Sequence, residues 1–183
     1  MNKLEKIKMF VEIPKGSINK YEYDYSKGVW NLDRVLHGSM FYPEEYGFIP
    51  ETLDYDGDPL DVICLTNFET FPGCNIDIRI IGVMKMIDQG DDDYKIIAVN
   101  NSDPRLKNIK KISDVSEEKL NEISHFFMRY KELEKKEVEI NGFGDEKEAE
   151  KVLEECIHLF KKFSHIKNNK NELIEAMKKS KIS

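Results

Sequence analysis

Short stretches in which apolar and polar residues alternate, separated by turn residues, fill the first hundred positions of this chain. Lys20-Tyr21-Glu22-Tyr23-Asp24-Tyr25 places aromatic residues on one face and charged residues on the other, which is the period-two pattern of a β-strand. Further strands are predicted around Val11-Glu12-Ile13 and at residues 29–32, 61–65, 76–83 and 95–99. Many short strands at this spacing favour a closed or nearly closed antiparallel β-barrel.

The second half of the chain has the three-to-four residue spacing of amphipathic helices. Asp114 with Glu117, or Ser116 alone, can cap a helix whose apolar residues extend from Leu120 to Leu133. After a break at Asn141-Gly142-Phe143-Gly144, the sequence predicts a second helix.

That second helix begins at Asp145, with Glu148 three residues further on, and its apolar face extends to Phe163. The chain is polar beyond about residue 165, although Leu173, Ile174 and Met177 allow a short helix there. The order of barrel first and helices second indicates an α+β fold or a decorated barrel.

At 183 residues the chain has the length of one domain with a substantial core. We therefore expect a single domain over residues 1–183. Its parts would be a barrel over roughly 10–100, two main helices within roughly 114–165, and a polar C-terminal extension at 166–183.

The net charge of −7 is unevenly distributed: residues 145–183 carry a net +1, and the rest of the chain a net −8. An acidic body is a poor partner for nucleic acid, which binds basic surfaces. No apolar run is long enough to span a membrane, and the first residues lack the apolar stretch of a secretory signal. Cys64, Cys74 and Cys156 are scattered without zinc-ligand spacing, so we expect reduced thiols in a cytoplasmic protein with no membrane partner.

The segment Asp54-Tyr55-Asp56-Gly57-Asp58-Pro59-Leu60-Asp61 carries four carboxylates in eight positions, directly before a predicted strand. Carboxylates this close repel one another, and the repulsion grows as water is excluded. Hard divalent cations, which take oxygen ligands, neutralise such a cluster. The segment therefore predicts a metal site at the edge of a sheet.

Two other structures compete with a metal site as explanations of this segment. A calcium-binding helix-loop-helix is excluded, because a loop that starts at Asp54 has Pro59 and Leu65 where that motif requires Gly and Glu. A solvated acidic turn stays open on this segment alone.

A second acidic group lies between the strands predicted at 76–83 and 95–99. If these strands form a hairpin, Asp88 and Asp93 lie on opposite arms near its mouth, and Lys95 points to the same face as Asp93. Taken alone, this group is also explained by a solvated hairpin turn.

Other segments add carboxylates and donors. Each has an ordinary explanation as a surface strand residue, an ion pair, a core residue or a solvated helix residue. The candidates are Glu12, Lys20, Glu22, Arg34, Tyr42, Tyr46, Tyr130 and Lys131. Together they supply acids for several metal ions and Lys, Arg and Tyr donors suited to phosphate oxygens.

The chain resembles the soluble family I inorganic pyrophosphatases, in motifs that follow the family order from about residue 10 to about 165. Asp56-Gly57-Asp58-Pro59-Leu60-Asp61-Val62 matches the family signature of three aspartates around a proline. The other matching segments are Glu12-Ile13-Pro14, Lys20-Tyr21-Glu22, Asp33-Arg34, Phe41-Tyr42-Pro43 with Tyr46-Gly47, Gly82-Val83-Met84-Lys85-Met86-Ile87-Asp88, and His125-Phe126-Phe127 with Tyr130-Lys131.

The resemblance implies hydrolysis of pyrophosphate to two orthophosphates on a five-stranded OB-like barrel, in a homo-oligomer that would be a hexamer. It implies Mg²⁺ as the cofactor, with several ions per site, and Mn²⁺ or Zn²⁺ as substitutes. Asp56, Asp61, Asp88 and Asp93 would be the metal ligands, with Glu12, Glu22 and Tyr42 in the outer shell. Lys20, Arg34, Tyr46, Lys95, Tyr130 and Lys131 would bind the phosphoryl groups. We assign the remaining aspartate of the signature, Asp58, as the acceptor of the attacking water's proton.

Two rival functions make different demands on the chain. A metal phosphohydrolase acting on nucleotides or phosphomonoesters would need a pocket for a base or a sugar, and no segment of the sequence offers one. A barrel that binds oligonucleotides would need a basic groove with exposed aromatic residues, which the net charge of the body opposes.

Overall fold

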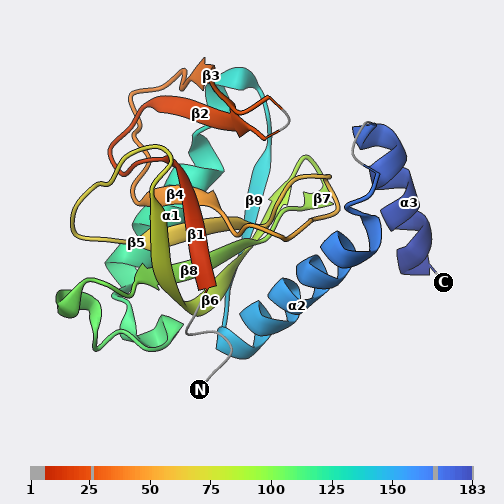
Figure 1. The fold of residues 1–183 in the computed structure, drawn as a ribbon. Coiled ribbons are helices and arrows are strands. Elements are labelled where there is room, and N and C mark those ends of the chain that lie inside the picture. Colours follow the sequence, from red (N-terminus) through yellow and green to blue (C-terminus); the bar gives the residue numbers. More distant parts are fainter. Residues whose placement is uncertain (1–6, 26, 167–168, 183) are drawn as a thin grey trace.

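The structure is a computed structural model that describes residues 7–25, 27–166 and 169–182 (Figure 1). Its strands are β1 (Ile7–Ile13), β2 (Asn19–Asp24), β3 (Val29–Val35), β4 (Glu45–Phe48), β5 (Asp61–Leu65), β6 (Asn75–Asp88), β7 (Asp91–Asp92), β8 (Lys95–Asn100) and β9 (Val138–Gly144). Its α-helices are α1 (Glu117–Arg129), α2 (Glu146–Phe163) and α3 (Lys170–Ile182). Short 3₁₀ turns occur at Pro104–Leu106, Ile112–Asp114 and Glu132–Glu134.

Five strands form a ring in the order β1-β4-β5-β8-β6, and β6 pairs back with β1. The expectation that all neighbours are antiparallel is wrong at one place: β5 and β8 are parallel, with Val62 opposite Ile96. The long strand β6 lies between β5 and β8 in sequence and reverses the chain direction, so β8 returns in the same direction as β5.

Strand β6 is longer than predicted and carries the chain beyond the ring. Residues 75–84 pair with β1 and β8, and residues 83–88 pair with β9 and, at the end of the strand, with β7. Asp88 is its last residue, so the extension determines where the second acidic group lies.

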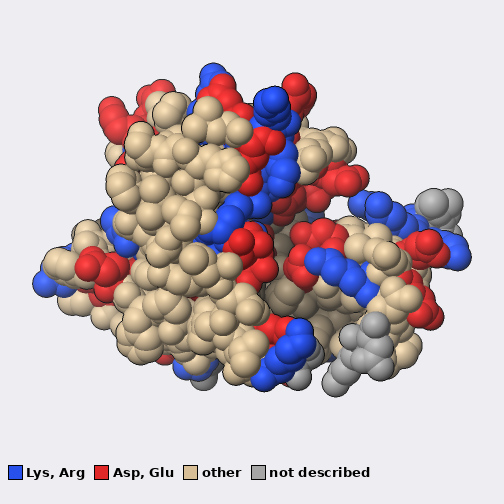
Figure 2. All heavy atoms as spheres, turned by 90° about the horizontal axis from the view of Figure 1, so that it is seen from above, with Lys and Arg blue, Asp and Glu red and all other residues tan. Residues whose placement is uncertain are grey.

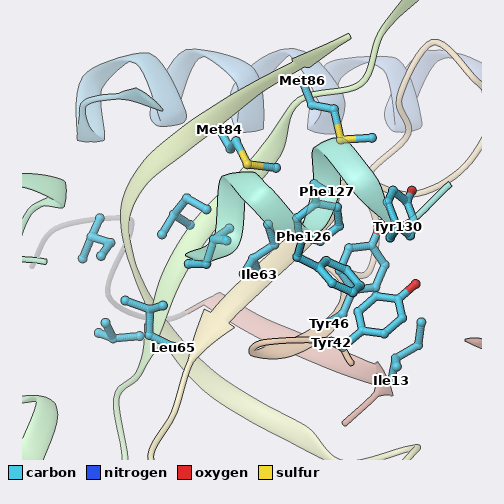
Figure 3. Close-up of a cluster of buried hydrophobic side chains, with 14 of the residues drawn as sticks. Ile13, Tyr42, Tyr46, Ile63, Leu65, Met84, Met86, Phe126, Phe127 and Tyr130 are labelled. Carbon is cyan, nitrogen blue, oxygen red and sulfur yellow. The ribbon is translucent and has the colours of Figure 1, made fainter. Parts of the chain in front are cut away.

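The strand β5 is buried on both of its faces, which explains its uninterrupted apolar sequence. Val62 and Cys64 belong to a cluster with Ala149, Leu153 and Cys156 of α2. Ile63 and Leu65 belong to a second cluster, in which α1 supplies Ile123, Phe126 and Phe127 (Figure 3). The two long helices therefore cover β5 from opposite sides.

The predicted starts of α1 and α2 agree with the structure. The Ser116 side chain accepts a hydrogen bond from the Lys119 amide, and Asp145 accepts from the second and third amides of α2. The end of α1 was predicted too late. Leu133 is exposed in the turn after the helix, because the chain leaves the helical path at Lys131.

The short helix that Leu173, Ile174 and Met177 allow in the C-terminal extension is present in the structure as α3. Leu173 and Met177 are buried there against Leu53, the residue before the acidic segment, and against Leu159 and Phe163 of α2. Figure 1 shows α3 beside the C-terminal end of α2. Among the described residues, no helix is both long and apolar enough to span a membrane.

Candidate active site

A cleft of about 530 Å³ opens where the acidic segment 54–61 faces the β2–β3 hairpin, the end of β6 and the end of α1. Figure 2 shows acidic and basic side chains side by side along this hollow. All of the predicted site residues except Arg34 line it: Glu12, Lys20, Glu22, Tyr42, Tyr46, Asp56, Asp58, Asp61, Asp88, Asp93, Lys95, Tyr130 and Lys131. The structure thus brings side chains more than a hundred positions apart into one cavity.

The acidic segment folds into a tight turn whose backbone is held by its own aspartates. The Asp58 amide donates to Asp56 Oδ1 at 2.9 Å, and the Asp54 amide donates to the Asp58 carbonyl at 2.7 Å. Gly57, at the tip, has a φ of +85°, which favours glycine. Leu60, fully buried in the core, anchors the turn to β5.

Lys95 lies at the floor of the cleft between two carboxylates. Its Nζ is 2.7 Å from Asp61 Oδ2 and 2.6 Å from Asp93 Oδ1, and the Tyr46 hydroxyl also donates to Asp61 Oδ2 at 2.6 Å. Burial by itself lowers the pKa of Lys95, but the two carboxylates outweigh it and hold that pKa well above its usual value. The ammonium group therefore stays charged although only 2 % of the side chain is exposed.

A second lysine pairs with the acid at the end of β6. Lys131 Nζ is 2.5 Å from Asp88 Oδ2. Lys131 and Tyr130 directly follow α1, and the Tyr130 ring packs on Phe126 and Phe127. The aromatic cluster thereby holds Tyr130 at the end of α1 (Figure 3), and Lys131 is the next residue in the chain.

Several cleft carboxyls resist ionisation. Burial raises the pKa of Glu12 to about 7. Desolvation within the turn, followed by the charge of Asp58, raises the pKa of Asp56 to about 7 even though its side chain is open to solvent. Burial and the charge of Asp61 raise the pKa of Asp93, against the opposing effect of Lys95. Added positive charge in the cleft would lower the pKa of all three carboxyl groups.

The side chains of this cleft have the chemistry to bind metal ions, but they are not already arranged as a coordination sphere. Within the described residues, no three His, Cys, Asp or Glu side chains converge tightly enough to hold one ion. Lys95 lies against Asp61 and Asp93, and Lys131 lies against Asp88. The donors are nevertheless all carboxylate oxygens, which suit hard divalent cations. One oxygen each of Asp56, Asp61 and Asp93 has no hydrogen bond within the described structure.

The β2–β3 hairpin supplies the opposite wall. Lys20 Nζ is 2.7 Å from Glu22 Oε1 and 3.2 Å from Asp33 Oδ2. The Tyr23 amide donates to Glu12 Oε1 at 3.0 Å, which ties the hairpin to β1. Tyr23 and Tyr25, which the sequence placed on an aromatic face, line the cleft and pack against Phe10.

Arg34 is the predicted site residue that does not line the cleft. Its guanidinium is 3.5 Å from Glu134 Oε1 and 3.8 Å from Asp33 Oδ2. The Arg34 Nε and the Glu134 Oε2 are buried without a hydrogen-bond partner in the described structure. The 3₁₀ turn after α1, which the sequence did not predict, supplies Glu134 and draws the guanidinium away.

Sequence reasoning missed one basic residue of the cleft, Lys170. It is the first residue of α3 and lies beyond every recognised motif. Only the packing of Leu173 and Met177, which the sequence showed as a short apolar repeat, could have indicated that the extension folds back.

Comparisons with known proteins agree with this geometry. Residues 9–161 match the family model described as inorganic pyrophosphatase. The inorganic pyrophosphatase of Halalkalibacterium halodurans is 50% identical over 155 residues, which is 85% of this chain and 95% of the relative. That of Ureaplasma parvum is 46% identical over 176 residues and covers 96% of each chain.

A solved structure gives the same result. The inorganic pyrophosphatase from Thermus thermophilus superposes with a TM-score of 0.84 at 43% sequence identity, covering 88% of this chain and 94% of that one. The fold, the cleft and these matches agree, and the chain belongs to the inorganic pyrophosphatase family.

Proposed function

We propose that the cleft between segment 54–61 and the end of β6 binds inorganic pyrophosphate with Mg²⁺ and hydrolyses it to two orthophosphates. Family membership assigns this reaction to the chain, and with it a general dependence on divalent metal ions. The location of the site is supported by one observation: acidic residues and lysines from distant segments line the same cleft.

The metal ligands that we propose are Asp56, Asp61, Asp88 and Asp93, with Glu12, Glu22 and Tyr42 acting through water. When bound, Mg²⁺ neutralises phosphoryl oxygens and lowers the pKa of a coordinated water. Mg²⁺ is favoured because the donors are all oxygen and the substrate brings phosphate, while Mn²⁺ or Zn²⁺ can substitute. The raised pKa values of Asp56, Asp93 and Glu12 support the need for added positive charge.

The substrate donors that we propose are the ammonium groups of Lys20, Lys95 and Lys131 and the hydroxyls of Tyr46 and Tyr130. They line one cavity and suit the many oxygens of pyrophosphate. Arg34 belongs to this set only if its side chain leaves Glu134.

For the chemical step we propose Asp58 as the proton acceptor. The water oxygen forms a bond to one phosphorus, the bridging P–O bond breaks, and the second orthophosphate leaves. The proton released by the water passes to Asp58 and from there to the leaving phosphate or to solvent. Asp58 is exposed at the cleft and its Oδ1 has no hydrogen bond in the described structure, which supports this role.

Release of orthophosphate from pyrophosphate, measured with and without Mg²⁺, tests the proposal. We expect turnover with Mg²⁺, its loss with a chelator, its return when Mg²⁺ is restored, and little release of phosphate from ATP. Phosphate release from ATP that equals release from pyrophosphate would instead indicate a nucleotide phosphohydrolase. Turnover that persists in excess chelator would overturn the metal-dependent mechanism.

We further propose that the five-stranded ring is an OB-type barrel within one domain over residues 1–183. Closure of the ring through β1 and β6 supports the barrel.

We also propose that the protein acts in the cytoplasm as a homo-oligomer, a hexamer by resemblance. The free Cys64 and Cys156, both buried, fit a reducing compartment. Three apolar side chains are exposed on β3, those of Val29, Leu32 and Val35, and they support association of subunits. Light scattering after size-exclusion chromatography measures the number of subunits.

A further inference from the structure

Helix α3 lies outside the family match, which ends at residue 161, yet it packs directly on the acidic segment. Leu53, the residue directly before that segment, is buried with Leu173 and Met177 of α3. Lys181 Nζ lies 4.3 Å from the centre of the Tyr55 ring. The helix is therefore attached to the segment as well as to α2.

The tip of the acidic turn contacts the first turns of α3. A Cβ added at Gly57 would lie 3.1 Å from Lys170 Cγ and 3.3 Å from Ile174 Cγ1. Contact this close leaves the tip little room to move while α3 is in place.

Lys170 extends this contact into the cleft. Its Nζ donates to Asp58 Oδ2 at 2.6 Å, and its side chain lines the same cavity as Lys20, Lys95 and Lys131. Each of those three lysines also pairs with an acid, and only Lys170 pairs with Asp58. Both partners are more than half exposed, so the pair adds little to stability.

We propose that Lys170 is a positioning residue for Asp58. It holds one carboxylate oxygen of Asp58, and the other oxygen, Oδ1, is left to accept the proton of the attacking water. This inference rests on the role of Asp58 under Proposed function. It makes α3 part of the catalytic apparatus in this chain, although the match to the family model ends before it.

Steady-state kinetics of Lys170→Met and Lys170→Arg at saturating Mg²⁺ test the proposal. Lys170→Met keeps the length of the side chain and removes its charge. We expect it to lower kcat about tenfold, as loss of a partner that orients a reacting group does. We expect KM for pyrophosphate to change less than about twofold, because the lost interaction does not bind substrate. Lys170→Arg should restore most of the rate.

The matched control is Lys179→Met, the same change at an exposed position of α3 that is not among the residues lining the cleft. Its kcat should equal that of the original protein. A tenfold loss in both Met variants would assign the effect to the helix as a whole and overturn the role of Lys170. A rise in KM with unchanged kcat in Lys170→Met would make it a substrate ligand and also overturn the proposal.

A double-mutant cycle separates this inference from the role of Asp58. Lys170→Met should have no further effect in an Asp58→Asn background, because Lys170 acts through that carboxylate. If Asp58→Asn is inactive but Lys170→Met has full activity, the inference fails and the proposed function stands. If Asp58→Asn has full activity, both roles fail, while pyrophosphate hydrolysis by the original protein is unaffected.

Discussion

At the scale of single residues, the cleft is a balance of opposite charges at short range. Lys95 is almost fully buried between the carboxylates of Asp61 and Asp93, and the Tyr46 hydroxyl donates to Asp61. Removal of the Lys95 charge leaves both carboxylates without a counter-charge, whereas removal of one carboxylate leaves Lys95 paired with the other.

Asp61→Asn is expected to lower kcat by at least about 100-fold. The change removes a proposed metal ligand and the carboxylate charge that pairs with Lys95 and accepts the Tyr46 hydrogen bond. The amide keeps the shape of the side chain, so the circular dichroism spectrum should not change. Asp77→Asn, at an exposed partner of Lys8, serves as the control and should keep full activity. Near-normal turnover of Asp61→Asn at saturating Mg²⁺ would contradict the ligand assignment.

Lys95→Met is expected to lower the free energy of unfolding by about 3 to 5 kcal/mol without metal, since it leaves Asp61 and Asp93 unpaired in the cleft. Added Mg²⁺ should recover part of this loss, because the ion replaces the missing positive charge and binds the folded state. Urea unfolding with EDTA and with Mg²⁺ measures both values. Lys85→Met, which breaks a more exposed pair with Glu148, should cost at most about 1 kcal/mol.

If the Lys95→Met variant is as stable as the original protein in EDTA, the two carboxylates do not depend on Lys95, and the charge balance described for the cleft is wrong. If EDTA and Mg²⁺ give equal stabilities while Lys95→Met is destabilised, the ion does not bind beside these carboxylates.

The identity of the acids could be predicted from the sequence because they lie within short motifs. Lys95 was predicted to share a face with Asp93, and the two pair. The other pairings could not be predicted, because Asp61 and Asp88, which pair with Lys95 and Lys131, lie on other elements. For the same reason the contact of Arg34 with Glu134 and the place of Lys170 in the cleft could not be predicted.

At the scale of elements, β2, β5 and β8 were predicted close to their observed bounds, whereas β1, β3 and β6 were predicted too short. Strands β4, β7 and β9 were missed. All four residues of β4 are buried, so it shows no alternation, and β9 contains two glycines that indicate a break. The parallel pairing of β5 and β8 could not be predicted, since alternation determines the faces of a strand but not its neighbours.

Gly47→Ala tests the closure of the ring between β1 and β4. A Cβ at Gly47 would lie 1.9 Å from the Phe10 carbonyl oxygen, and the backbone cannot move without breaking the pairing with Val11. We expect a loss of about 3 kcal/mol or more in unfolding free energy, measured by urea denaturation.

The control is Gly16→Ala, where φ is +84° and no atom lies within 4 Å of the added Cβ. There only the backbone strain remains, about 1 to 2 kcal/mol. If the two variants lose equal stability, the close approach of β4 to β1 is not as described.

At the scale of the whole molecule, an acidic body concentrates its unfavourable charge in one cleft, so metal ions should stabilise the fold. Binding at 100 times Kd adds about 2.7 kcal/mol per site, and each 1 kcal/mol raises Tm by about 2 to 4 °C in a chain of this size. We therefore expect Mg²⁺ to raise Tm by several degrees relative to EDTA. NaCl at matched ionic strength should not raise Tm in this way. An equal rise in Tm with NaCl would indicate general screening of charge repulsion and no specific Mg²⁺ site.

The most direct test of the account is a crystal structure of the protein with Mg²⁺. The account predicts Mg²⁺ in the cleft, with ligands both from the segment that holds Asp56 and Asp61 and from the hairpin that holds Asp88 and Asp93. Mg²⁺ bound elsewhere, with these four carboxylates still engaged only by Lys95 and Lys131 and the solvent, would contradict it.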